Sequence, residues 1–129
     1  MRRGGLQLTR RLTSSRLDSY HEILTSDIGI SWWHRPHAQE TLKAARPDDA
    51  YYWATHQGAE LDLLMLKGSR RVGVEFKRAD APKLTPSMRI AMEDLKLDAL
   101  FVLYPGLKRY ALADRIEVLP ATAIGEFTG

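Results

Sequence analysis

The chain has 129 residues, of which 44% are hydrophobic and 27% are charged, and these proportions are typical of one globular domain. Because the sequence contains no cysteine, it excludes a disulfide framework, a thiolate zinc site and cysteine nucleophile chemistry. No apolar run approaches the ~20 residues of a membrane span and no secretory signal is evident, so we expect a cytoplasmic protein with no membrane partner.

Positive charge is concentrated at the N-terminus. Residues 1–17 contain five arginines and no acidic residue, whereas the remaining 112 residues carry 14 basic and 16 acidic side chains. Such a start is typical of a solvated tail, a targeting peptide or an arm that contacts nucleic acid. We therefore assign residues 1–30 to a basic N-terminal arm, with a helix expected near 15–25, and residues 31–129 to the folded domain.

The domain is expected to begin with a helix over residues 36–45, because proline fits its first turn and Pro47 prevents its continuation. Aromatic and β-branched residues at 51–55 predict a strand. Strands at 60–66 and 71–77 follow, joined by a turn. Alternation in the strand at 60–66 puts the two acidic residues on one face and three apolar residues on the other, namely Leu61, Leu63 and Met65.

A second helix and a buried strand complete the predicted domain. Thr85 followed by Pro86 is typical of a helix start, and the helical pattern continues to about residue 97. The short apolar run at 99–104 predicts a buried strand, and shorter strands are expected at 108–112 and 115–119. The order is therefore αβββαβ with a small β extension, which predicts an α/β fold with a mixed sheet flanked by helices.

The hairpin at 60–77 brings acidic side chains together. If Gly68 and Ser69 form a two-residue loop, the two residue numbers of each cross-strand pair add up to 137. Asp62 then lies opposite Glu75, and Glu60 opposite Lys77, all on one face because strand side chains have a period of two. Directly opposed side chains have Cβ atoms about 5 Å apart, so we expect the carboxyls of Asp62 and Glu75 to be close neighbours.

Two opposed carboxylates destabilise a sheet unless a cation lies beside them. One solution is Mg²⁺ or Mn²⁺ held by Asp62 and Glu75, with water completing the coordination. A metal so placed can polarise a phosphoryl oxygen and activate water, while Lys77 orients that water or stabilises developing charge. Glu60 is assigned as a partner of Lys77 or a secondary ligand. The alternative is a sheet edge with ordinary ion pairs.

Asp62 and the later Glu75-Phe76-Lys77 resemble the pattern of the PD-(D/E)XK nuclease superfamily, in which these residues lie on adjacent antiparallel strands of an αβββαβ core. The resemblance implies a restriction-endonuclease-like fold and metal-dependent hydrolysis of DNA phosphodiesters. It also implies that Asp62 and Glu75 are metal ligands, and that these two residues and Lys77 are catalytic.

A closer resemblance extends over about residues 48–120. It is to an uncharacterised domain found C-terminal to predicted bacterial and archaeal AAA+ ATPases, and it rests on five motifs: Tyr52-Trp53, residues 58–62, residues 73–77, Tyr104-Pro105-Gly106 and Val118-Leu119-Pro120. The resemblance implies an ATPase module as partner and makes Glu40 the nearest counterpart of an acidic residue in the entry helix. Ala54 stands where that family usually has arginine. The 129 residues contain no Walker A loop, so we expect a lone C-terminal module or a fragment of a longer ATPase.

Basic residues near the hairpin offer contacts to nucleic-acid phosphates. The candidates are Arg70, Arg71, Arg78 and Lys83, although a solvated hairpin tip explains the first two equally well. The leading hypothesis is a Mg²⁺-dependent deoxyribonuclease module. The alternatives are a catalytically inactive recognition or interaction domain associated with an ATPase, and a degraded gene product that folds without activity.

Overall fold

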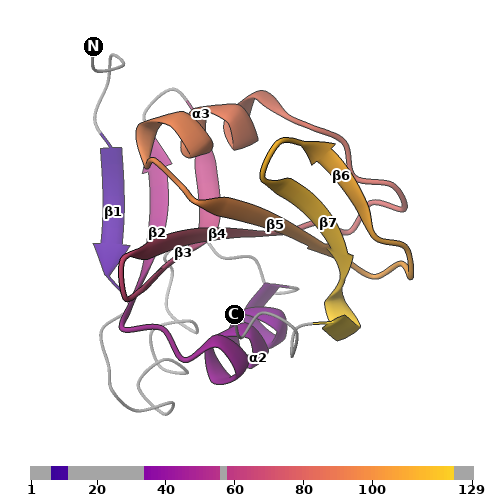
Figure 1. Cartoon of the computed structure of the whole chain (residues 1–129), viewed down its shortest axis with the longest axis horizontal. Coiled ribbons are helices and arrows are strands. Elements are labelled where there is room, and N and C mark those ends of the chain that lie inside the picture. The colour runs from indigo at the N-terminus through magenta and orange to yellow at the C-terminus, as the bar shows by residue number, and fades with distance from the viewer. Residues whose placement is uncertain (1–6, 12–33, 56–57, 124–129) are drawn as a thin grey trace.

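The computed structural model describes residues 7–11, 34–55 and 58–123. The elements in chain order are β1 (Gln7–Arg11), α2 (His34–Ala45), β2 (Asp49–Thr55), β3 (Glu60–Lys67), β4 (Arg70–Phe76), α3 (Pro86–Asp94), β5 (Ala99–Tyr104), β6 (Tyr110–Ala113) and β7 (Ile116–Pro120) (Figure 1). From α2 to β5 this is the predicted αβββαβ order, and the predicted extension of two short strands follows it. Within these residues no helix has both the length and the apolar character needed to cross a membrane.

The strands form one mixed sheet of seven strands in the order β1-β2-β3-β4-β5-β7-β6. Strands β1 to β4 pair antiparallel, β4 with β5 and β5 with β7 pair parallel, and β6 with β7 pair antiparallel. A parallel pair requires a crossover, and α3 supplies it between β4 and β5. The carboxyl ends of β4 and β5 therefore lie at the same edge of the sheet.

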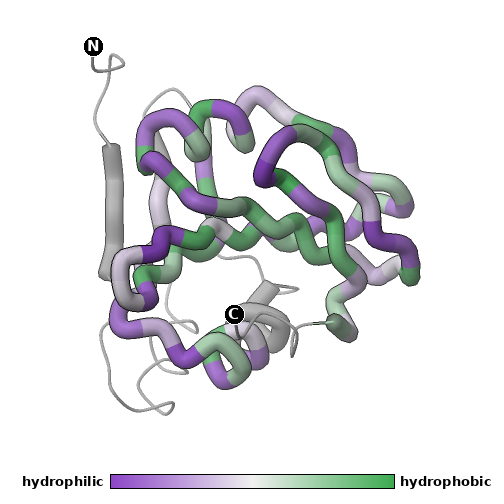
Figure 2. The backbone as a smooth tube through the Cα atoms, in the orientation of Figure 1, coloured by the Kyte–Doolittle hydropathy of each residue, from purple (hydrophilic) through white to green (hydrophobic). Residues whose placement is uncertain are grey.

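The two helices cover opposite faces of the sheet (Figure 1). Leu42 of α2 packs in one buried cluster with Val74 and Phe76. Met88 of α3 packs in a second cluster with Leu100. Hydrophobic residues continue along the central strands, as Figure 2 shows. The prediction of a mixed sheet flanked by helices is therefore confirmed.

Helix α3 begins as the sequence predicts and ends earlier. The hydroxyl of Thr85 accepts a hydrogen bond from the backbone N–H of Met88 at 3.2 Å, and Pro86 occupies the first turn. The helix ends at Asp94 rather than near 97, because Lys96 adopts a left-handed backbone with φ of 52° and such a residue terminates a helix.

Part of the basic arm joins the sheet. Gln7–Arg11 forms β1, which pairs antiparallel with β2 from Gln7 opposite Thr55 to Arg11 opposite Tyr51. No strand was predicted there, since four of these five residues are polar. Strand β1 thus pairs with the edge of β2 that would otherwise be open. The helix expected near 15–25 falls outside the described residues.

The hairpin of β3 and β4 has the predicted register, with pairs from Leu63 opposite Val74 to Lys67 opposite Arg70. The same strand is irregular on its other side. Tyr51 of β2 pairs with Leu64, but Trp53 pairs with Leu61, so β3 holds one extra residue between these pairs. This is the arrangement of a β-bulge, which bends a strand and redirects its side chains.

Because of the bulge, the side chains of β3 do not alternate as the sequence predicted. Leu61 packs with Leu64 in the cluster on the α3 side, whereas Leu63 and Met65 pack on the α2 side. Leu61 was expected to share a face with Leu63. Asp62 lies between these two leucines, so the irregularity of β3 is located at the residue that carries the predicted chemistry.

Candidate functional site

Asp62 and Glu75 meet where the registered pairing of β3 and β4 ends. The backbone N–H of Asp62 donates to Oε1 of Glu75 at 3.2 Å. In return, the backbone N–H of Phe76 donates to Oδ2 of Asp62 at 2.8 Å. Each carboxyl group therefore accepts a backbone N–H of the neighbouring strand. Both side chains are buried, since Asp62 is 5% exposed and Glu75 is 6% exposed.

Lys77 completes the cluster from the solvent side. Its Nζ lies 3.4 Å from Oε2 of Glu75, and its side chain is 37% exposed. Its backbone N–H donates to the carbonyl oxygen of Leu103 at 2.8 Å, which fixes the residue against β5. The structure thus brings Asp62, Glu75 and Lys77 together, as the hairpin spacing predicted.

Burial dominates the electrostatics of the carboxyl pair. It raises the pKa of Glu75 to about 8, with a further increase from the charge of Asp62 and a decrease from Lys77. It raises the pKa of Asp62 to about 6, against the lowering effects of the Phe76 N–H and of Lys77. Without a cation, the two buried groups therefore hold a proton near neutral pH that a cation can replace.

The donor set suits a hard divalent cation. Mg²⁺ is usually bound through one or two carboxylates and retains several waters, and Asp62 and Glu75 provide two carboxyl groups at one point. In the part of the chain that the structure describes, no group of three or more His, Cys, Asp and Glu side chains converges. Asp62 and Glu75 are therefore the two protein ligands that such a cation could use here, and water would have to complete its coordination.

The two secondary acids occupy different positions. Glu60 is exposed at the start of β3, and its charge contributes to the raised pKa of Asp62. Glu40 is exposed on α2. Neither of them forms a group of three potential metal ligands with Asp62 and Glu75 among the described residues.

The four basic candidates lie at opposite ends of β4. Arg70 and Arg71 are exposed at its start, whereas Arg78 and Lys83 are exposed in the loop after its end. A seven-residue strand is roughly 20 Å long. The structure therefore does not unite them in one cluster around the hairpin, because the strand itself separates the two pairs.

Arg71 has a structural environment at the hairpin end. Its backbone N–H donates to Oδ2 of Asp98 at 2.7 Å, and its Nη1 donates to the carbonyl oxygen of Leu95 at 2.9 Å. The guanidinium thus binds a carbonyl at the C-terminal end of α3, where positive charge is favoured.

Tyr110, which sequence reasoning missed, and Tyr104, which it named only as part of a motif, make hydrogen bonds to the loops that follow β4 and β5. Tyr110 donates its hydroxyl proton to the carbonyl oxygen of Pro82 at 2.8 Å. The hydroxyl of Tyr104 donates to the carbonyl oxygen of Lys108 at 2.9 Å and accepts from its N–H at 2.8 Å. The parallel pairing of β4 and β5, which an intervening helix favours, is the signal that could have indicated this proximity.

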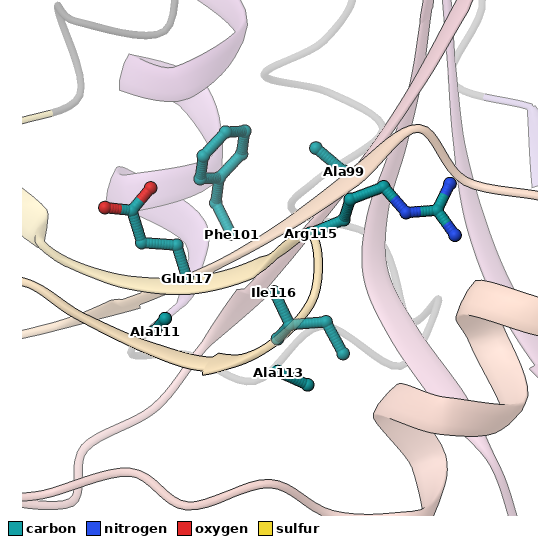
Figure 3. A pocket seen from close by; sticks show the side chains of 7 residues that line it. All are labelled: Ala99, Phe101, Ala111, Ala113, Arg115, Ile116 and Glu117. Atoms are coloured by element: carbon teal, nitrogen blue, oxygen red, sulfur yellow. The ribbon is translucent and has the colours of Figure 1, made fainter.

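An open hollow lies elsewhere on the sheet. Its volume is about 230 Å³, and it is formed by residues of β5, β6 and β7 and the turn before β7, namely Ala99, Phe101, Ala111, Ala113, Arg115, Ile116 and Glu117 (Figure 3). Neither carboxyl of the hairpin lines it. The candidate site is therefore distinct from this hollow.

Two bacterial proteins are similar to this chain. They are the uncharacterized proteins Mb2031c of Mycobacterium bovis and Rv2008c of Mycobacterium tuberculosis, and each is 41% identical over 98 residues. The matches cover 75% of this chain and 22% of each relative, so the chain spans about a fifth of the length of the curated relatives it matches. No solved structure matches the chain significantly.

A family model matches most of the described domain. The match extends over residues 37–124 and carries the description "Domain of unknown function (DUF4143)". It includes β3, β4 and the cluster of Asp62, Glu75 and Lys77. The chain therefore belongs to the DUF4143 family.

Proposed function

We propose that this domain is a nuclease module that hydrolyses DNA phosphodiesters with Mg²⁺ or Mn²⁺. The observation that carries the proposal is the buried pair of Asp62 and Glu75 on adjacent strands, with Nζ of Lys77 at 3.4 Å from Glu75. The αβββαβ order and the spacing of these three residues support a restriction-endonuclease-like core of the PD-(D/E)XK kind.

Each side chain has a separate task in this proposal. Asp62 and Glu75 hold the cation, whose chemistry is to polarise the phosphoryl oxygen and to lower the pKa of a bound water. The backbone N–H groups of Asp62 and Phe76 fix the two carboxyls in orientation. Lys77 is partly exposed, so its ammonium can reach both Glu75 and an incoming phosphate, where it orients water or stabilises negative charge.

The wider protein context forms a second part of the proposal. The mycobacterial relatives extend well beyond the matched region, because that region covers 22% of each. Together with the sequence resemblance to domains C-terminal to AAA+ ATPases, this length supports a module that acts beside an ATPase module in a longer bacterial protein.

The alternative is an inactive recognition domain that retains the fold. It is favoured by the reciprocal hydrogen bonds of Asp62 and Glu75 with backbone N–H groups. These bonds satisfy both carboxyl groups in part without a metal, so the cluster can also serve to join β3 to β4.

Nicking of supercoiled plasmid with 5 mM Mg²⁺ or Mn²⁺ separates the two functions. We expect nicking by the unaltered protein and a loss of roughly a hundredfold or more in Lys77→Ala and Asp62→Asn, since removal of one stabilising group at a transition state has effects of this size. Lys43→Ala removes an exposed lysine on α2 and is the matched control.

The outcomes assign the function. Equal nicking by the unaltered protein and by Lys77→Ala identifies a contaminating nuclease and contradicts the proposal. Absence of nicking with either metal on supercoiled, linear and single-stranded substrates assigns the inactive recognition function.

A further inference from the structure

Basic side chains gather on two loops that leave the sheet at the same edge. Parallel pairing of β4 and β5 continues to Phe76 opposite Leu103, so the loops at 77–85 and 105–109 both begin at this edge. They contain one acidic residue, Asp80, and five basic residues, which are Lys77, Arg78, Lys83, Lys108 and Arg109. We call these two loops the basic edge.

Hydrogen bonds tie the first loop to β6 and the second loop to the end of β5. The hydroxyl of Tyr110 bonds the carbonyl oxygen of Pro82 in the first loop. The hydroxyl of Tyr104 bonds both the N–H and the carbonyl oxygen of Lys108 in the second. The rings of Tyr104 and Tyr110 meet edge to face at 6.3 Å, and Figure 1 shows both loops on the same side of the molecule, beside β6. The positive charges are therefore carried by a preorganised surface, which lowers the entropic cost of binding.

The basic edge is continuous with the candidate site. Lys77 is the first residue of the loop at 77–85, and its Nζ contacts Glu75. Arg78, Lys83, Lys108 and Arg109 are all exposed. At the other end of β4, the guanidinium of Arg71 donates to the carbonyl oxygen of Leu95 at the end of α3. Exposed positive charge is thus placed next to the carboxyl pair on a supported surface.

We infer that the basic edge binds the backbone phosphates of double-stranded DNA next to the bond that the proposed site hydrolyses. The inference rests on the proposed function and adds the binding surface, including Lys108 and Arg109 from a loop that lies about thirty residues beyond the hairpin. Phosphate contacts by lysine and arginine supply the sequence-independent part of DNA affinity and position a protein on the duplex. One edge of the domain therefore carries both the positioning charges and the side chains that, in the proposed function, hold the cation and orient the attacking water.

Binding of a fluorescein-labelled 20-base-pair duplex, followed by anisotropy in EDTA between 50 and 200 mM salt, tests the surface without cleavage. The double variant Lys83→Ala/Lys108→Ala should weaken binding and reduce the slope of log K against log salt by about 1.8, since each phosphate contact contributes roughly 0.9. Both side chains are exposed, so thermal melting should be unchanged.

The control removes the same charge from elsewhere. Lys43→Ala lies on α2, and Lys96→Asn lies beyond α3, where asparagine tolerates the left-handed backbone. This pair should leave the salt slope unchanged. An unchanged slope in Lys83→Ala/Lys108→Ala, an equal decrease in the control, or no binding by the unaltered protein would each overturn the inference.

The inference and the proposed function can fail separately. Nicking by the unaltered protein together with an unchanged salt slope in the double variant rejects the basic edge and retains the nuclease. A salt slope that falls as expected in a protein that nicks no DNA rejects the nuclease and retains the basic edge as a DNA-binding surface. If the alanine variant melts at a lower temperature, Lys83→Gln/Lys108→Gln repeats the measurement.

Discussion

Acidic and basic side chains lie at both ends of β4, but their environments differ. At the hairpin end, Arg71 binds the backbone of α3 and Asp98 accepts its N–H. At the other end, Glu75 is buried beside Asp62, and Lys77 reaches it from the solvent boundary. At the hairpin end the charges join elements to one another. At the other end they leave a buried carboxyl pair whose ionisation is costly, and this cost makes it a candidate for chemistry.

The largest expected difference between the two ends is in pH dependence. Burial raises the pKa of Asp62 to about 6 and that of Glu75 to about 8, from ordinary values of 3.8 and 4.5. Between about pH 4 and 8 these two groups therefore bind more protons in the native state than in the unfolded state, so their contribution to stability falls as pH rises. Without metal, we expect the free energy of unfolding to fall by a few kcal/mol over this window.

Urea unfolding from pH 4 to 9 in EDTA measures this decrease. Glu75→Gln should flatten the profile because it removes the group with the higher pKa. Arg71→Ala, at the other end of β4, should keep the slope of the unaltered protein. A stability profile that rises across this window would contradict the protonated pair.

Gly73 lies between the two ends of β4, and a substitution there tests how tightly the strand packs against the α3 side. A Cβ at this position would lie 2.8 Å from a methyl carbon of Leu97 and of Leu100. Both leucines are buried in the cluster on the α3 side, so Gly73→Ala should destabilise the protein by roughly 1–3 kcal/mol through overpacking. Thermal melting gives the effect, and an unchanged melting temperature would show that the leucines move without cost.

A divalent cation should bind at the carboxyl end of β4 and not at the hairpin end. At pH 8, Mg²⁺ at about five times its dissociation constant should add about 1 kcal/mol, because a ligand that binds the native state stabilises it by mass action. Differential scanning fluorimetry with and without Mg²⁺ measures the gain. Asp62→Asn and Glu75→Gln should lose it, whereas Arg71→Ala should retain it. A gain that persists in both carboxyl variants would place the cation elsewhere.

The smallest expected effect belongs to the hairpin end. Arg71→Ala removes a hydrogen bond from an exposed guanidinium to the carbonyl oxygen of Leu95, so we expect a loss of about 1 kcal/mol or less. Plasmid nicking should be unchanged, since this arginine is separated from Glu75 by most of β4. A large loss of nicking without a loss of stability would give Arg71 a role at the substrate.

The sequence was most informative where short-range chemistry determines structure. Gly68 and Ser69 fix the register of β3 with β4, and that register alone brings Asp62 near Glu75. Thr85 caps α3 as expected because its hydroxyl meets a nearby N–H. These features depend on residues close in the chain, so composition and spacing are enough to predict them.

Long-range pairing explains what was missed. The bulge at Asp62 and Leu63 arises from the pairing of β3 with β2, and nothing in the alternation of β3 indicates an extra residue. β1 consists mainly of polar residues and was not recognised as a strand. Lys108 could be placed near Lys83 only after the parallel pairing of β4 with β5 was known, because 25 residues separate them in the chain.

Because of the reciprocal hydrogen bonds of the carboxyl pair, two backbone amides can report on the state of the site. The N–H of Asp62 and the N–H of Phe76 each bond a side-chain oxygen whose ionisation and coordination change when a cation binds. In a ¹⁵N-correlated spectrum these two resonances should therefore move first during titration with acid or Mg²⁺, while amides in the paired stretch from Leu63 to Lys67 remain in place. The occupancy of the site can then be followed at two backbone positions without any substrate.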